Sequence, residues 1–101
     1  MDIRLTEGNL RNNHFYLRTA ESLLPSDCIG GSNKSDLGKP IHVTFEPGPS
    51  IECDVAGDKM ILRACAQVRD FFERSDSRAG DTLRFMRVGE REFLVRRSGA
   101  G

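Results

Sequence analysis

The stretch 41-IHVTFEPGPSIECDV-55 decides most of the predicted fold, because it alternates between apolar and polar residues on both sides of a turn signal. From Ile41 to Phe45 every second residue is apolar, which is the period of a half-buried strand. The Pro-Gly pair in the middle suits a tight turn. The second half alternates in the same way and would leave Glu52 and Asp54 facing solvent. The stretch therefore predicts an antiparallel hairpin.

A second pattern follows this hairpin. In 64-ACAQVRDFFERS-75 the apolar residues recur every third or fourth position, so we expect an amphipathic helix of about three turns. The stretch SRAGD ends it, with Gly80 as the left-handed turn residue. The segments 82–88 and 91–97 then predict a second hairpin, in which Gly89 takes the first position of a type II′ turn.

The N-terminal part carries weaker signals. We interpret 14-HFYL-17 as a strand, and we expect one helical turn within 20-AESLLPSDCIG-30, stopped by its proline. Residues 1–13 are an unassigned leader, either a strand that completes the fold or a disordered segment. The single domain is expected to span residues 14–97, with a flexible C-terminus at 98–101.

Together these elements predict a mainly β fold with one or two short helices, arranged as a small seven-stranded open pseudobarrel. A barrel of this size is filled by its own side chains, so function is expected on its loops. No apolar run is long enough for a membrane span, and the N-terminus does not resemble a signal peptide, so a cytoplasmic location is expected.

The charges are balanced, with 15 basic and 15 acidic residues among 101. This balance argues against a general nucleic-acid coat or a polybasic membrane binder, although it leaves room for a local basic face. Twelve of the basic residues are Arg, the side chain that makes bidentate contacts with phosphate, guanine or carboxylate. A compositional bias of the genome would produce the same excess.

No pattern indicates catalysis. Ser26 and Asp27 lack the Gly-x-Ser-x-Gly elbow of a nucleophile, and the stretch GGSNKS lacks the spacing of a phosphate-binding loop. Three widely spaced cysteines and two distant histidines predict neither a disulfide framework nor a metal site. We therefore expect a protein that is not an enzyme and has no cofactor.

Two polar interruptions remain, 26-SDCIGGSNKSD-36 and 56-AGDKMILR-63. Glycine lets the backbone approach a partner closely, and Ser, Asn, Lys and Arg donate hydrogen bonds to phosphates and base edges. On a rigid barrel, two such loops could form a pincer. Two ordinary solvent-exposed connections would have the same composition.

The stretch 67-QVRDFFERSDSRAGDTLRF-85 resembles the C-terminal half of the B-three DNA-binding domain, the pseudobarrel of plant transcription factors. That family has a helix with an aromatic residue, a linker closing with Ala-Gly-Asp, and a strand with an inward Phe. Upstream, LLPSDCIGGSNK is similar to the Ser-Asp segment that opens the family's N-terminal recognition arm. The resemblance covers residues 14–97. Unlike the plant domains, this chain has no Trp and no net charge.

This resemblance implies a domain that recognises double-stranded DNA with two arms in the major groove, as a transcription regulator or as the recognition module of a restriction system. Carried over by position, the arms are residues 26–34 and 56–63. Phosphate contacts are expected from Arg18, Lys34 and Lys59, and base contacts from Ser32, Asn33, Asp58 and Arg63. Ser26, Gly30 and Gly31 complete the predicted DNA-binding set. Two alternatives stay open: a protein-interaction module of the same fold, and a small ligand-binding or catalytic barrel.

Overall fold

The computed structural model describes residues 1–33 and 35–99, and this part of the chain is mainly β with short helices, as predicted. Eight strands, two α-helices and two 3-10 helices follow one another along the described residues. In chain order they are β1 (Asp2–Arg4), α1 (Glu7–Asn12), η1 (Arg18–Leu23), η2 (Ser26–Cys28), β2 (Ile29–Gly30), β3 (Ile41–Glu46), β4 (Ser50–Cys53), β5 (Val55–Ala56), β6 (Ile61–Leu62), α2 (Cys65–Ser75), β7 (Thr82–Arg87) and β8 (Glu92–Gly99).

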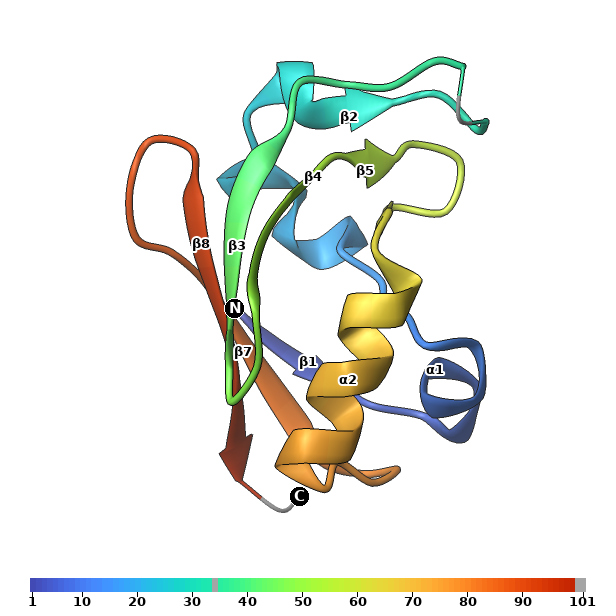
Figure 1. Cartoon of the computed structure of the whole chain (residues 1–101), viewed down its shortest axis with the longest axis vertical. Coiled ribbons are helices and arrows are strands. Elements are labelled where there is room, and N and C mark those ends of the chain that lie inside the picture. The colour runs from blue at the N-terminus through green and yellow to red at the C-terminus, as the bar shows by residue number, and fades with distance from the viewer. Residues whose placement is uncertain (34, 100–101) are drawn as a thin grey trace.

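The strands form two sheets. One has five strands in the order β1-β7-β8-β3-β4, and the other has three in the order β2-β5-β6. Neighbouring strands are antiparallel except for the pairs β3 with β8 and β2 with β5. Within the described residues the pairing closes neither sheet on itself. Figure 1 shows the three-stranded sheet at one end of the molecule and α2 along one face of the larger sheet.

The first predicted hairpin is confirmed. Strands β3 and β4 pair with Ile41 opposite Cys53 and Val43 opposite Ile51. The apolar residues of β3 are buried, and its polar residues lie on the other face. The turn is closed by the Phe45 amide, which donates to the carbonyl of Pro49 at 3.0 Å.

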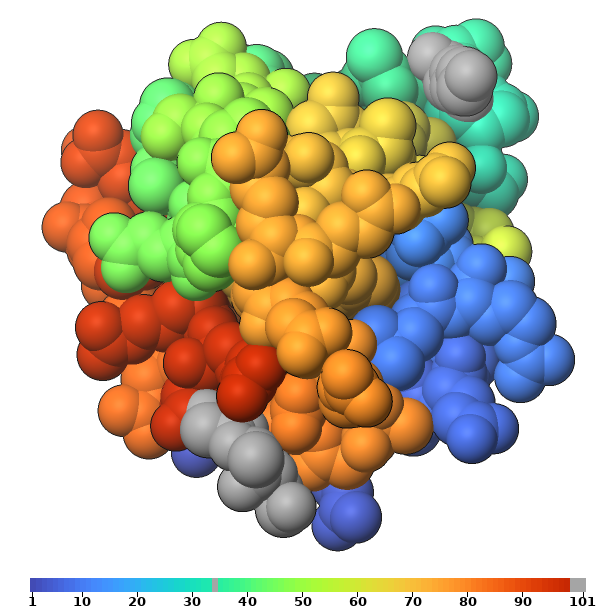
Figure 2. All heavy atoms as spheres, turned by 60° about the horizontal axis from the view of Figure 1, so that its bottom comes forward, coloured from blue at the N-terminus to red at the C-terminus, as the bar shows by residue number. Residues whose placement is uncertain are grey.

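The helix α2 also contributes buried side chains to the core. Its buried residues are Val68, Phe71 and Phe72, so the predicted apolar stripe is confirmed at these positions, whereas Cys65 is exposed. The space-filling view in Figure 2 shows this helix between the N-terminal segment and the strands of the larger sheet. Burying each such side chain contributes about 1.5–3 kcal/mol, so this packing is a main source of stability.

The strand predicted at residues 14–17 is wrong, although its apolar pattern is informative. Phe15 and Leu17 are buried and Tyr16 is exposed, but no strand forms there. The Leu17 amide donates to the carbonyl of Met60 at 2.7 Å. The segment buries its apolar side chains without forming a strand. An alternating pattern indicates which side chains face the core, but a strand also needs a neighbouring strand to pair with.

The strand count also differs from the seven that we expected. The predicted strand across residues 50–55 divides into β4 and β5, which belong to different sheets. The two residues of β2 add a strand, and so do residues 2–4, which pair with β7. At the other end, β8 reaches Gly99, beyond the expected boundary at residue 97. Residues 100 and 101 lie outside the described part.

Of the two predicted glycine turns, the first is partly confirmed, because Gly80 has the expected positive φ of 94°. It does not end the helix, however: α2 ends at Ser75 and is capped by Asp76, which takes the left-handed conformation with φ 52°, four residues before Gly80. The Ser77 amide donates to the carbonyl of Phe72, which closes the helix in a Schellman-type cap. Gly89 has no positive φ, so the type II′ turn is absent. The side chain of Arg87 instead holds a wider loop by donating to the Gly89 carbonyl at 3.0 Å.

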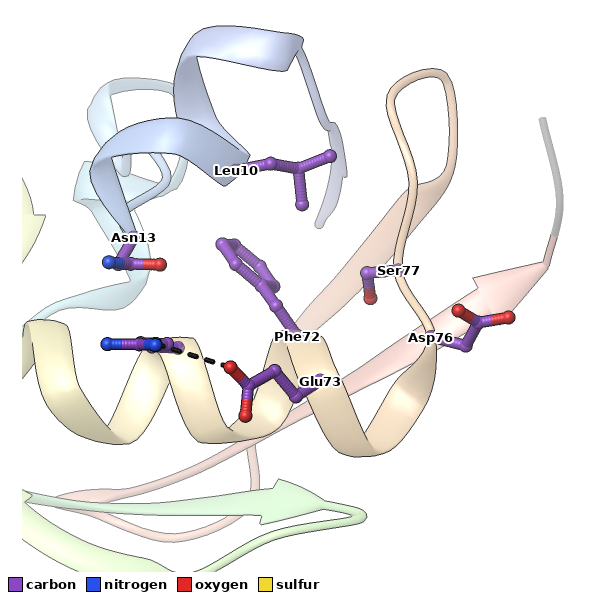
Figure 3. Close-up of a pocket in the computed structure, with 7 residues that line it drawn as sticks. Leu10, Asn13, Phe72, Glu73, Asp76 and Ser77 are labelled. Carbon is purple, nitrogen blue, oxygen red and sulfur yellow. Dashed lines mark hydrogen bonds and ion pairs between the residues drawn. The ribbon is translucent and has the colours of Figure 1, made fainter.

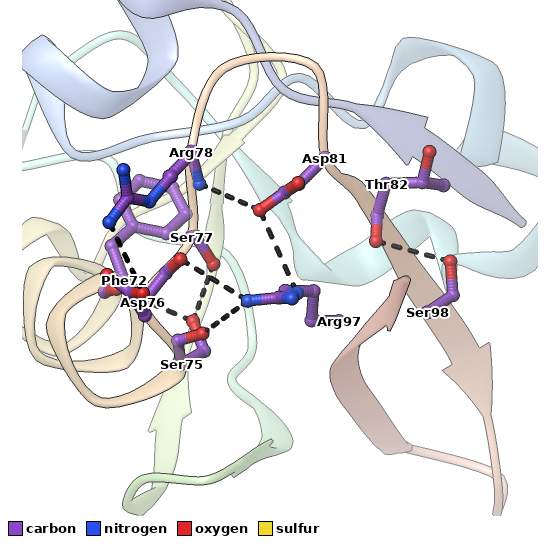
Figure 4. A network of polar contacts seen from close by, with 9 residues as sticks. All are labelled: Phe72, Ser75, Asp76, Ser77, Arg78, Asp81, Thr82, Arg97 and Ser98. Atoms are coloured by element: carbon purple, nitrogen blue, oxygen red, sulfur yellow. Dashed lines mark hydrogen bonds and ion pairs between the residues drawn. The ribbon is translucent and has the colours of Figure 1, made fainter. Parts of the chain in front are cut away.

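A polar network fixes the C-terminal end of α2 to the larger sheet (Figure 4). Arg97 of β8 donates to the carbonyl of Ser75 at 2.8 Å and also approaches the carboxylate of Asp81 at 3.8 Å. That carboxylate accepts a hydrogen bond from the Arg78 amide at 2.9 Å. These residues stabilise the linker between α2 and β7, so we assign them to the fold.

Candidate nucleic-acid interface

Strand pairing brings the two polar segments together. Ile29 lies opposite Val55 and Gly30 opposite Ala56, and the Gly57 amide donates to the Gly30 carbonyl at 3.0 Å. The described residues 31–33 and 35–38, which we call the arm loop, therefore lie beside the turn at residues 57–60, which we call the β5–β6 turn. Both project to the same side at one end of the molecule (Figure 1).

The glycines of this region are required by close contacts between backbones. A Cβ atom on Gly57 would collide with the Gly30 carbonyl oxygen. On Gly30 it would lie 2.6 Å from the carbonyl oxygen of Asp36 and 2.6 Å from a carboxylate oxygen of Asp54. Since real Cβ atoms do not approach so closely, a side chain at residue 57 would push the β5–β6 turn away from Gly30, and one at residue 30 would displace the arm loop and Asp54. These close contacts explain why residues 30 and 57 are glycines.

An ion pair between the buried Asp54 and the half-buried Arg63 lies at the base of the two loops. Arg63 Nε is 2.9 Å from Asp54 Oδ1, and Arg63 Nη2 is 3.1 Å from Asp54 Oδ2. Only 5% of the Asp54 side chain and 18% of the Arg63 side chain are exposed. Asp54 also accepts from the Gly38 amide at 2.8 Å, and Arg63 Nη2 donates to the Gly31 carbonyl at 2.9 Å. The pair thus contacts both ends of the arm loop.

The position of Asp54 corrects the sequence analysis, which placed it in solvent. The alternation of the strand stops at this residue, because β4 ends at Cys53 and β5 begins at Val55 in the other sheet. Burial by itself would raise the pKa of Asp54, but the hydrogen bonds from Arg63 and the Gly38 amide outweigh it and lower the pKa below its usual value. Asp54 is therefore charged at neutral pH.

The other predicted DNA-binding residues differ in exposure. Their side chains are exposed at Arg18, Ser26, Ser32, Asn33, Asp58 and Lys59, while Gly30 and Gly31 are half-buried. Arg18 Nη2 donates to the Asp58 carbonyl at 3.2 Å, which links η1 to the β5–β6 turn. Asn33 accepts a hydrogen bond from the Ser35 amide at 3.1 Å. Lys34 lies outside the described residues.

Ser26 lies apart from the arm loop, in η2 before β2. Its neighbour Asp27 forms a 2.7 Å ion pair with Arg91 from the β7–β8 loop. The hydrogen bond from Arg91 lowers the pKa of Asp27. Arg91 also donates to the Lys39 carbonyl at 3.1 Å, so the chain on either side of the arm loop is held by the larger sheet.

The exposed surface of the two loops has mixed charge. Arg18 and Lys59 are positive, whereas Asp36 and Asp58 are negative. Burial lowers the pKa of the neighbouring His14, and the Lys59 ammonium lowers it further, so this ring is neutral at pH 7. A partner of this surface therefore meets hydrogen-bond donors and acceptors together with a few separate charges.

Two shallow depressions lie outside the loops. The first, of about 390 Å³, is lined mainly by α1 and α2, and Leu10 points toward the ring of Phe72 there (Figure 3). Glu73 at this site is paired with Arg69 at 3.2 Å. The second, also about 390 Å³, is a largely apolar hollow along residues 61–67 and Ala56. Neither is lined by a histidine, so neither brings a histidine base to a nucleophile.

Residues 1–33 and 35–99 contain no cluster of three His, Cys, Asp or Glu side chains that could hold a metal ion. None of their helices combines the length and the apolar character that crossing a membrane requires.

Comparison with protein-family models, with curated proteins and with solved structures found no match.

Proposed function

We propose that this chain is a B-three-like pseudobarrel that binds double-stranded DNA without catalysing a reaction, with the arm loop and the β5–β6 turn as its contact surface. In this proposal the two open sheets and the helices around their shared core constitute the pseudobarrel. The observation that carries the proposal is the parallel pairing of β2 with β5, which unites two polar loops from distant parts of the chain in one projecting edge.

The shape of this edge suits a groove of DNA. The major groove is about 12 Å wide and admits a two-stranded β-ribbon. Strands β5 and β6 form a short two-stranded ribbon that ends in the β5–β6 turn, and the arm loop follows β2, which pairs with β5. Ser32 and Asn33 would contact base edges, and Asp58 would accept a hydrogen bond from a cytosine amino group.

The charged residues have separate roles in this proposal. Arg18 and Lys59 would contact phosphates on either side of the groove, and sequence reasoning adds Lys34. Arg63, which we expected to read bases, has its guanidinium engaged by Asp54 and Gly31, so we assign it a positioning role. With about two or three phosphate contacts, the logarithm of affinity should fall with the logarithm of salt concentration with a slope of about −2 to −3.

The experiment is fluorescence anisotropy with a randomised duplex pool at about 50 and 200 mM salt. Arg18→Ala and Lys59→Ala should each weaken binding and reduce the salt slope by about one unit. Arg11→Ala is the matched control, because Arg11 is an exposed residue of α1, and Figure 1 shows α1 away from the two loops. The proposal fails if the wild type does not bind at low salt or if Arg11→Ala has the same effect as the loop variants.

One observation favours a protein-interaction module as the second candidate. Leu37 is 61% exposed next to the last residue of the arm loop, and its charged neighbours in sequence, Asp36 and Lys39, have opposite signs. An apolar side chain in a neutral surface suits a protein partner. In that case Leu37→Ser would abolish the interaction and Lys59→Ala would leave it intact.

A further inference from the structure

We propose that Asp54 and Arg63 are positioning residues that hold the arm loop in one conformation for DNA recognition. The effect that we expect on DNA binding rests on the proposed function. The part that concerns the conformation of the loop can be tested on the free protein.

The contacts of the pair coincide with the two ends of the arm loop. Arg63 Nη2 donates to the carbonyl of Gly31, the first residue of the loop, and the Asp54 carboxylate accepts from the amide of Gly38, its last residue. The two side chains hold each other through two further hydrogen bonds. One rigid unit therefore fixes the distance between the two ends of the loop.

The interior of the loop is ordered by its own backbone. The Gly31 amide donates to the Asp36 carbonyl at 2.7 Å, and the Asp36 amide donates to the Asn33 carbonyl at 3.2 Å. The first of these contacts needs Gly31 at a fixed position. Loss of the ion pair should release the base of the loop first and these inner hydrogen bonds afterwards.

The pair also connects the two contact elements to each other. Arg63 follows β6, Asp54 precedes β5, and both act on the loop that follows β2. The Arg63 amide donates to the Asp54 carbonyl at 3.0 Å, so the backbones on the two sides of the β5–β6 turn are joined at the same place. The relative position of the arm loop and the turn thus depends on these two residues.

Preorganisation has a specific consequence for binding. A loop that is ordered before binding loses less conformational entropy when it meets its partner. Non-specific attraction to phosphates does not need that order, because it depends on the number of positive charges. Release of the loop should therefore weaken binding to a preferred duplex much more than binding to a scrambled one.

The test compares Asp54→Asn and Arg63→Lys with Asp70→Asn, which breaks an exposed pair with Arg74 on α2 and serves as the matched control. Asn keeps the shape of Asp but presents an amide to the guanidinium. Lys keeps the charge of Arg but lacks the fork that contacts Asp54 and Gly31 together. Arg63→Lys is the milder change and keeps the test valid if Asp54→Asn does not fold.

The first measurement is amide hydrogen exchange on the free protein. The Gly38 and Gly31 amides should exchange at least about tenfold faster in Asp54→Asn and Arg63→Lys, while the Val43 amide in β3 and all amides of Asp70→Asn stay within about twofold of the wild type. Unchanged exchange at Gly38 would overturn the inference, whatever the result with DNA.

The second measurement uses the duplex preferred by the wild type and a scrambled duplex of the same length. The loop variants should lose at least about tenfold in affinity for the preferred duplex and less than about threefold for the scrambled one, with an unchanged salt slope. Equal losses on both duplexes would overturn the role in recognition. If the wild type binds neither duplex, the proposed function and this role fail together, and Gly38 exchange decides the conformational part alone.

Discussion

The ring centroids of Phe45 and Phe71 lie 5.4 Å apart, and this contact joins strand β3, which lies between β8 and β4 in the larger sheet, to the helix α2. Phe45 is 1% exposed and Phe71 is fully buried. The two rings come from the predicted hairpin and the predicted amphipathic helix. They connect the two segments whose patterns are clearest in the sequence.

Phe71→Ala should therefore destabilise the protein by about 3–5 kcal/mol, because it leaves a cavity between the helix and the sheet. The measurement is the free energy of unfolding from a denaturant titration. Arg74→Ala, on the exposed side of the same helix, should change it by less than about 0.5 kcal/mol. A loss below about 1 kcal/mol for Phe71→Ala would contradict this packing.

Hydrophobic periodicity predicted the elements that are long enough to show a repeating pattern of apolar residues. The β3–β4 hairpin, the stripe of α2 and the β7–β8 pairing all have enough residues to show a period. Strands β2 and β5 have two residues each, so they have no period to detect, and their pairing depends on contacts between distant parts of the chain. Local patterns could not reveal it.

The sequence likewise predicted only part of the candidate site. Polar composition correctly indicated exposed side chains at Ser32, Asn33 and Lys59. It could not reveal that Asp54 is buried, because the chain changes sheets between residues 53 and 55. Its partner Arg63 is nine positions away in an irregular segment, where no helical or strand spacing links the two. The functional role of these loops stays a prediction.

Gly57→Ala should destabilise the protein by about 1–3 kcal/mol, because the added methyl group collides with the Gly30 carbonyl and forces β2 away from β5. Gly8→Ala is the matched control, since a Cβ in α1 would approach no closer than 3.7 Å to its nearest neighbour, Thr6 Oγ1. Alanine there should stabilise the protein by about 0.5–1 kcal/mol. Thermal unfolding of the two variants checks both signs, and similar shifts in the two would contradict the close approach of the backbones.

Acid should remove the stabilisation that Asp54 provides. Its pKa in the folded protein is lowered, chiefly because hydrogen bonds from Arg63 and the Gly38 amide outweigh the opposing effect of burial. The stabilisation is therefore fully present above the unfolded-state pKa of about 3.9 and is lost as the pH falls through the lower folded-state value. Urea titrations from about pH 6 to pH 3 should show the stability of the wild type converging on that of Asp54→Asn. A gap that stays constant over this range would exclude ionised Asp54 as its source.

The most direct test of DNA binding through the two loops is an NMR titration of the labelled protein with a duplex pool, followed at every backbone amide. The proposed function predicts that the largest shifts occur in the arm loop, the β5–β6 turn at residues 57–60, and Arg18. Shifts centred on Leu10 and Phe72, or no shifts at a DNA concentration of about 1 mM, would contradict it, since non-specific binding alone has dissociation constants of about 10⁻⁴–10⁻⁶ M.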